Sequence, residues 1–85
     1  MDRQRRYRDM ADRLKPLAWD HLTANQQAMV DACLSAGEPY EAMLDLLWVA
    51  GVNGADRNLV ADAVALLDDE DKDEFMKLLV YTAHS

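Results

Sequence analysis

The chain has 85 residues and a formal net charge of −7, from nine basic and sixteen acidic side chains. Its length fits one domain, and its hydrophobic fraction of 51% is too high for a disordered protein. The single cysteine, Cys33, excludes an intramolecular disulfide, which argues against a disulfide-stabilised secreted scaffold. No signal peptide is evident, and no apolar run approaches the roughly 20 residues that span a bilayer. We therefore expect a cytoplasmic protein with no membrane partner.

Charge is distributed unevenly along the chain. Residues 1–15 contain six of the nine basic side chains and carry a net charge of +3, whereas residues 16–85 carry −10. We expect one helical domain over residues 1–85, with a basic N-terminal helix or arm at 1–15 and an acidic helical body at 16–85. Nucleic-acid-binding proteins contact phosphates through clustered lysines and arginines, so this acidic body argues against nucleic acid as a direct partner.

Apolar residues recur at helical spacing in the first segment, and no strand alternation is evident along the chain. Pro16 lacks a backbone N–H, so it should kink this segment or split it into two helices near Lys15. The expected apolar stripe of the segment consists of Tyr7, Met10, Ala11, Leu14, Leu17 and Ala18.

Capping signals predict where the next two helices begin. The sequence from Thr23 to Gln26 fits a capping box, so a helix should begin after Thr23. Gly37 suits the position just after its end, and Pro39 suits the first turn of the following helix. The expected core face of the helix after Thr23 consists of Met29, Val30, Cys33 and Leu34.

The helix expected over residues 39–50 is apolar on nearly every side. Only Glu41 and Asp45 interrupt its apolar surface, and Gly51 should end it. A helix that is apolar on most faces is buried on most faces. We therefore expect this helix at the centre of the fold.

Two further helices complete the expected fold. Asp56 is a candidate N-cap for the first, and Asp68, Asp69 or Asp71 for the second. Their apolar positions are Leu59, Val60, Ala63, Val64 and Leu67, then Phe75, Met76, Leu79, Val80 and Ala83. The predicted fold class is all-α, a compact single-domain bundle of five to six short helices. The predicted core includes Leu44, Leu47, Trp48, Val60, Val64, Phe75 and Leu79.

Six acidic side chains within residues 68–74 form the first candidate site. Asp69, Asp71 and Asp73 match the first three ligand positions of an EF-hand loop. The match then fails, because Glu74 stands where the loop needs Gly and Val80 where it needs Glu. The run is either a helix cap with a solvated surface or a contact for a basic partner protein. For the second interpretation, the partner-binding residues are Asp68, Asp69, Glu70, Asp71, Asp73 and Glu74.

The sequence supplies no residue set for metal binding or catalysis. One cysteine and two histidines, His21 and His84, cannot provide the four N or S ligands of a structural zinc site. Cys33 lies on an apolar stripe, where a thiol behaves as a small buried hydrophobe. No phosphate-binding glycine loop is present. We expect no metal, no cofactor and no enzymatic activity.

A second candidate surface combines the N-terminal arginines with a tryptophan. Arg3, Arg5 and Arg6 are either solvated or attracted to an acidic face, including that of a second copy of the chain. Trp19 lies beyond Pro16 and off the first apolar stripe, so it either packs in the core or anchors a partner.

Two functions fit these features. The first is a small acidic binding protein, an inhibitor or immunity-type protein, that docks on a basic nucleic-acid-binding effector such as a nuclease. In size and charge, although in no motif, the chain resembles small acidic helical proteins of phages and toxin–immunity pairs, including some anti-CRISPR proteins. This resemblance implies a phage anti-defence or antitoxin-like role in which the acidic surface mimics nucleic acid. Such a surface steers onto a basic cleft and disfavours wrong partners.

The alternative is a helical adaptor that assembles with itself. Five or six short helices in this length resemble the death-fold layout in outline, and a basic segment against an acidic body suits head-to-tail association. A homodimer is a related expectation. The chain begins with Met and ends in a short polar tail. We interpret it as a complete gene product, which favours the inhibitor.

Overall fold

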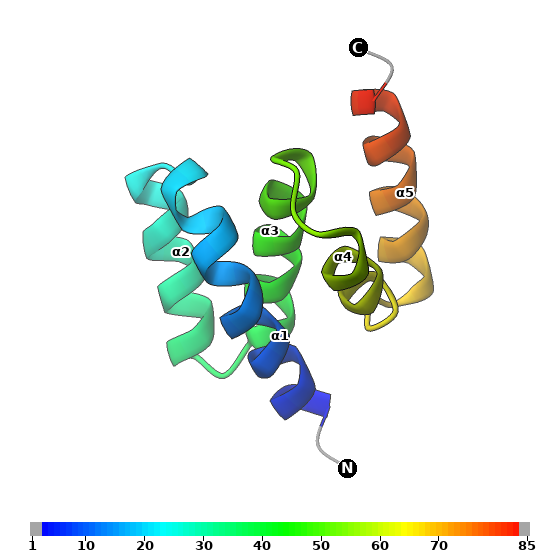
Figure 1. Cartoon of the computed structure of the whole chain (residues 1–85). Helices are drawn as coiled ribbons and strands as arrows, with labels where there is room; N and C mark the ends of the chain where they lie inside the picture. Colours follow the sequence, from blue (N-terminus) through cyan, green and yellow to red (C-terminus); the bar gives the residue numbers. More distant parts are fainter. Residues whose placement is uncertain (1–2, 84–85) are drawn as a thin grey trace.

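The computed structural model describes residues 3–83, with side chains through residue 78. Most of these residues are helical and none lies in a strand, so the expected all-α bundle is confirmed. The elements are α1 (Arg3–Ala18), the 3-10 helix η1 (Trp19–His21), α2 (Ala24–Ser35), α3 (Pro39–Val52), α4 (Arg57–Val64) and α5 (Asp69–Ala83). Figure 1 shows α3 at the centre, with α2 and α5 on opposite sides of it.

Helix α1 continues through Pro16 as far as Ala18. Of the two alternatives expected at Pro16, a kink or a split, the split into two helices near Lys15 is therefore wrong. Proline removes one backbone donor, and here it does so in the last turn, where the helix is about to end. Leu14 and Ala18 lie on either side of Pro16 and are fully buried, so packing secures this turn. The chain then tightens into η1.

The expected capping box is present at the start of α2. Thr23 Oγ1 accepts a hydrogen bond from the Gln26 N–H at 3.2 Å, and Gln26 Oε1 accepts one from the Thr23 N–H at 2.8 Å. The two bonds satisfy donors that a helix start otherwise leaves without partners. The predicted N-terminal boundary of α2 is therefore confirmed.

The link between α2 and α3 also follows the sequence signals. Gly37 has a φ of 78°, the left-handed conformation that glycine adopts most easily. Its N–H donates to the Leu34 carbonyl, and the next N–H, from Glu38, donates to the Cys33 carbonyl. Pro39 then begins α3 and is itself buried.

Helix α3 extends two residues beyond its expected end because it passes through Gly51. A Cβ added at Gly51 would lie 3.3 Å from Cζ of Phe75 in α5, which is tighter than an ordinary contact. The glycine therefore gives α5 room to approach α3. The helix ends where the Asn53 side chain donates a 2.8 Å hydrogen bond to the Val49 carbonyl.

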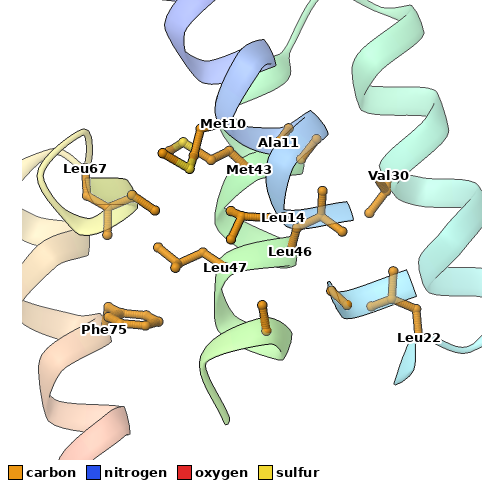
Figure 2. Packing of buried hydrophobic residues seen from close by; sticks show 14 residues of the cluster. Met10, Ala11, Leu14, Leu22, Val30, Met43, Leu46, Leu47, Leu67 and Phe75 are labelled. Carbon is orange, nitrogen blue, oxygen red and sulfur yellow. The ribbon is translucent and has the colours of Figure 1, made fainter. Parts of the chain in front are cut away.

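The core surrounds α3. In Figure 2, Leu47 extends from α3 toward Leu67 and Phe75. Of the predicted core residues, Leu47 and Phe75 are buried, while the side chain of Leu79 lies outside the described ones. The others pack against the core half-buried: Leu44, Trp48, Val60 and Val64. The buried hydrophobic residues are Met10, Ala11, Leu14, Ala18, Leu22, Val30, Ala42, Met43, Leu46, Leu47, Ala50, Ala63, Leu67 and Phe75.

Three side chains that helical spacing assigned to the core are exposed. Leu17 is 43% exposed and Met29 is 61% exposed. In α2 only Val30 is buried, because this helix packs chiefly on α3 and its contact stripe is narrow. Met76 of α5, another predicted core position, is 47% exposed.

Tyr40 joins the start of α5 to the rest of the fold. Its Oη donates a 2.6 Å hydrogen bond to Asp71 Oδ2 and accepts one of 3.0 Å from the Asp68 N–H. Its ring meets that of Tyr7 edge-on, with centroids 4.9 Å apart. Burial, followed by the hydrogen bond to Asp71, raises the pKa of Tyr40. The hydroxyl therefore stays protonated at neutral pH and remains a donor.

Candidate functional site

The predicted acidic run lies at the start of α5. Asp68 precedes the helix, and the other five acids occupy its first two turns, so no calcium-binding loop forms here. Residues three or four apart share a helix face, and this spacing divides the run. Asp71 and Glu74 line a hollow against α3. The exposed acids of the run outside this hollow are Asp69, Glu70 and Asp73, together with Asp68, which lines another hollow against α1.

The hollow between α3 and α5 has a volume of about 180 Å³. Most of its wall is apolar, and two of its rings, Trp48 and Phe75, meet edge-on with centroids 6.0 Å apart. Carboxyl groups reach it from both helices. The lining residues are Leu44, Asp45, Trp48, Asp71, Glu74, Phe75 and Leu78. We call this site the acidic hollow.

The three carboxyl groups of the acidic hollow differ in their surroundings. Asp71 is half-buried and accepts the hydrogen bond from Tyr40. Glu74 is exposed. Asp45 is also exposed over much of its side chain, yet desolvation raises the pKa of its carboxyl group. No basic side chain lines the hollow, so its negative charge has no counter-ion among the lining residues.

Asp45 was not among the residues predicted for the site. The available signal was its position as one of two acids on an otherwise apolar helix. A charged side chain beside buried surface loses hydration, which costs free energy unless another interaction compensates for it. That signal marks Asp45 as unusual, but it does not reveal that α5 places Glu74 and Asp71 beside it.

Replacing Asp45 with asparagine is expected to raise the thermal unfolding midpoint at neutral pH. Desolvation raises the folded pKa of Asp45 above its ordinary value, so the folded state favours the protonated carboxyl group. The stabilisation that this group contributes is therefore present below the ordinary pKa of aspartate and is lost as the pH rises through the folded pKa. Asparagine removes the ionisation while it keeps the shape of the side chain.

Thermal melts at neutral pH and at about pH 3 check this expectation. The gain from Asp45→Asn should be present at neutral pH and should shrink in acid, where the wild-type carboxyl group is protonated. Asp62→Asn makes the same chemical change at an exposed aspartate of α4, outside the acidic run, and is the matched control, with little expected change. A lower midpoint for Asp45→Asn at neutral pH would contradict the desolvation of this carboxylate.

The residues of the second candidate surface lie in two separate places. Arg3 and Arg6, exposed at the start of α1, line a hollow of about 190 Å³ together with Asp68. The basic segment therefore lies beside the start of the acidic helix within one molecule. Trp19 follows the other end of α1 and is half-buried, with Lys15 Nζ 4.5 Å from its ring centroid. The arginines and the tryptophan thus do not form one continuous surface.

The thiol of Cys33 is half-buried, and burial raises its pKa. The nearby charges that raise it further are those of Asp45, Glu38 and Glu41. The protonated thiol is a weak nucleophile, which fits the expected structural role. His21 is exposed in η1, and His84 lies outside the described residues. Within the described part of the chain, no group of three or more His, Cys, Asp or Glu side chains is placed to hold a metal ion.

Comparisons with protein-family models, curated proteins and solved structures found no match to this chain. None of the helices in the described residues is long and apolar enough to cross a bilayer. The function must therefore be inferred from the chemistry of the surfaces themselves.

Proposed function

We propose that the chain is a small binding protein whose acidic hollow receives an arginine or lysine side chain from a basic partner protein. The observation that carries the proposal is the combination, in one hollow, of three carboxyl groups with an apolar and aromatic wall. A metal ion or a phosphate would not suit such a wall. A cationic side chain would, because it joins a long apolar stem to a charged head.

Each part of the acidic hollow matches one part of that side chain. The apolar stem packs against Leu44 and Leu78, which together remove it from water. The half-buried ring of Trp48 lines the hollow, where an aromatic ring attracts a cation. Asp45 and Glu74 accept hydrogen bonds from the charged head, and a guanidinium forms such bonds in pairs.

The remaining acids of α5 act at longer range. Asp69, Glu70 and Asp73 are exposed, and their mutual repulsion weakens the fold rather than supporting it. Their field draws a basic surface toward the acidic hollow before contact is made. A cleft that binds nucleic acid is lined by basic side chains and is therefore positively charged. An inhibitor of a nuclease or of another nucleic-acid-binding effector is the function that best fits this acidic surface.

Affinity capture from the source cells with three baits tests the proposal. The baits are the wild type, a hollow variant (Asp45→Asn with Glu74→Gln) and an outer-face variant (Asp69→Asn with Asp73→Asn). Both variants remove two negative charges from exposed positions, and Asp71 is kept because it holds Tyr40. We expect a strongly basic protein on the wild-type and outer-face baits in about 0.15 M salt, and its loss from the hollow variant.

Retention of the same protein by the hollow variant would contradict the proposal, as would capture of acidic proteins alone. Sedimentation of the purified chain addresses the adaptor alternative. Self-association that rises with concentration, and falls when Arg3 and Arg6 are changed to Gln, would favour assembly through the basic segment.

A further inference from the structure

A second hollow lies between α4 and α5 and adjoins the acidic hollow at Phe75. Figure 1 shows α4 nearly end-on beside the long axis of α5, so the two helices cross steeply. Steeply crossing helices touch over a short stretch and leave a wedge of open space between them. The wedge is lined by Gly51, Ala55, Arg57, Asn58, Val60, Ala61, Val64, Ala65, Lys72, Phe75 and Met76. We call this site the cationic groove.

The charge of the cationic groove is opposite to that of the molecule. Residues 16–85 contain thirteen acidic and three basic side chains. Two of those three basic residues, Arg57 and Lys72, line the groove, and none of the thirteen acids does. The other lining residues are apolar except Asn58. Its surface therefore pairs apolar walls with positive charge.

The volume of the groove suits a small ligand. At about 660 Å³ it falls within the range of roughly 300–1,000 Å³ typical of small-molecule sites. Among the described side chains, α4 lines it from Arg57 to Val64 and α5 from Lys72 to Met76.

We propose that the cationic groove binds an anionic amphiphile, a molecule with an apolar hydrocarbon tail and a carboxylate head, such as a medium-chain fatty acid. The tail lies against Val60, Val64 and Met76, which are otherwise half-buried or exposed to water. The carboxylate pairs with Arg57 or Lys72. The site differs from the acidic hollow in its polar groups, although the two adjoin each other at Phe75.

Isothermal titration calorimetry with dodecanoate, below its micelle concentration, tests the proposal. We expect saturable binding to the wild type and no comparable binding of a nonionic amphiphile with the same dodecyl tail, because its head has no charge with which Arg57 or Lys72 can pair. Changing Arg57 and Lys72 together to Gln should weaken dodecanoate binding about tenfold. Changing Arg13 and Lys77 to Gln removes the same charge from exposed residues outside the groove, and should leave binding within about twofold.

A third variant tests the tail without a change of charge. Ala61 is exposed and lines the groove, so Ala61→Phe should fill part of it and weaken dodecanoate binding while the helical circular dichroism is unchanged. The fluorescence of Trp48 gives a second readout, because its ring contacts Phe75, which lines the groove. In a Trp19→Phe background, dodecanoate should change this emission.

Three results would overturn the proposal. The first is the absence of saturable dodecanoate binding at concentrations up to about 1 mM. The second is equal weakening by the groove and control variants, which would show that only net charge matters. The third is a dimer in sedimentation that Ala61→Phe dissociates, which would show that a second copy of the chain covers the groove.

Discussion

Replacing Leu47 with alanine is expected to lower the free energy of unfolding by about 2–5 kcal/mol. Leu47 is fully buried on the central helix, and Figure 2 shows it extending toward Leu67 and Phe75. The substitution removes the apolar contacts and leaves a cavity that helices from both sides of α3 must close. A domain of this length has a total stability of roughly 4–13 kcal/mol, so a loss of this size threatens the whole fold.

Urea unfolding followed by circular dichroism measures the loss. Leu17→Ala is the matched control, because it makes the same chemical change at a leucine that is 43% exposed. We expect the control to lower stability by less than about 1 kcal/mol. Equal losses for Leu17→Ala and Leu47→Ala would mean that α3 is not the centre of the core.

Replacing Phe75 with alanine is expected to cost about 3–5 kcal/mol and to act first on α5. Phe75 is the only buried residue of α5 among the described side chains, and it packs edge-on against Trp48. Two hydrogen bonds, from Tyr40 to Asp71 and from the Asp68 N–H to Tyr40, still hold the start of the helix. The helix should then open more readily than the α1–α3 part of the fold.

Amide hydrogen exchange separates these two parts of the molecule. In the Phe75→Ala variant, the amides of α5 should exchange faster while those of α3 near Leu46 remain protected. Met76→Ala, at the neighbouring exposed position, should leave exchange in α5 close to that of the wild type. Uniform loss of protection across α3 and α5 would show that α5 opens only with the rest of the protein.

Local signals in the sequence predicted the helix starts well. The capping box at Thr23, the N-cap at Asp56 and the left-handed Gly37 each depend on a few neighbouring residues, and each is present. The end of α3 was harder to predict. Gly51 reads as a helix stop in isolation, but here it lies inside the helix and makes room for Phe75, which is distant in the sequence.

The candidate site depends still more on contacts between distant parts of the chain. The acidic run was recognisable as a charged segment, whereas its division into hollow-lining and exposed acids follows from the way α5 packs on α3. Tyr40 and Asp71 are 31 residues apart, so their hydrogen bond leaves no local sequence signal. For the same reason, Asp45 could be marked as an unusual acid but not assigned to a site with Glu74.

This arrangement also explains why an acidic surface would be kept at a cost to stability. Desolvation of Asp45 and repulsion within the run on α5 both weaken the folded state. Residues that break the rules of stable folding are expected at functional sites, where binding compensates for them. Asp45→Asn is therefore expected to raise stability, and the hollow variant, which contains the same substitution, is expected to lose binding.

The dissociation rate of a bound cationic probe tests this account most directly. The probe is a fluorescent arginine-rich peptide or the captured partner. It is bound to the wild type, to the hollow variant (Asp45→Asn with Glu74→Gln) and to the outer-face variant (Asp69→Asn with Asp73→Asn). Its release from each protein is then followed in about 0.15 M salt. Loss of long-range charge slows association in both variants, whereas loss of direct contacts speeds dissociation. We expect release to be at least about tenfold faster from the hollow variant and unchanged from the outer-face variant. Equal release rates from the two variants would contradict the role of the acidic hollow in holding the cation.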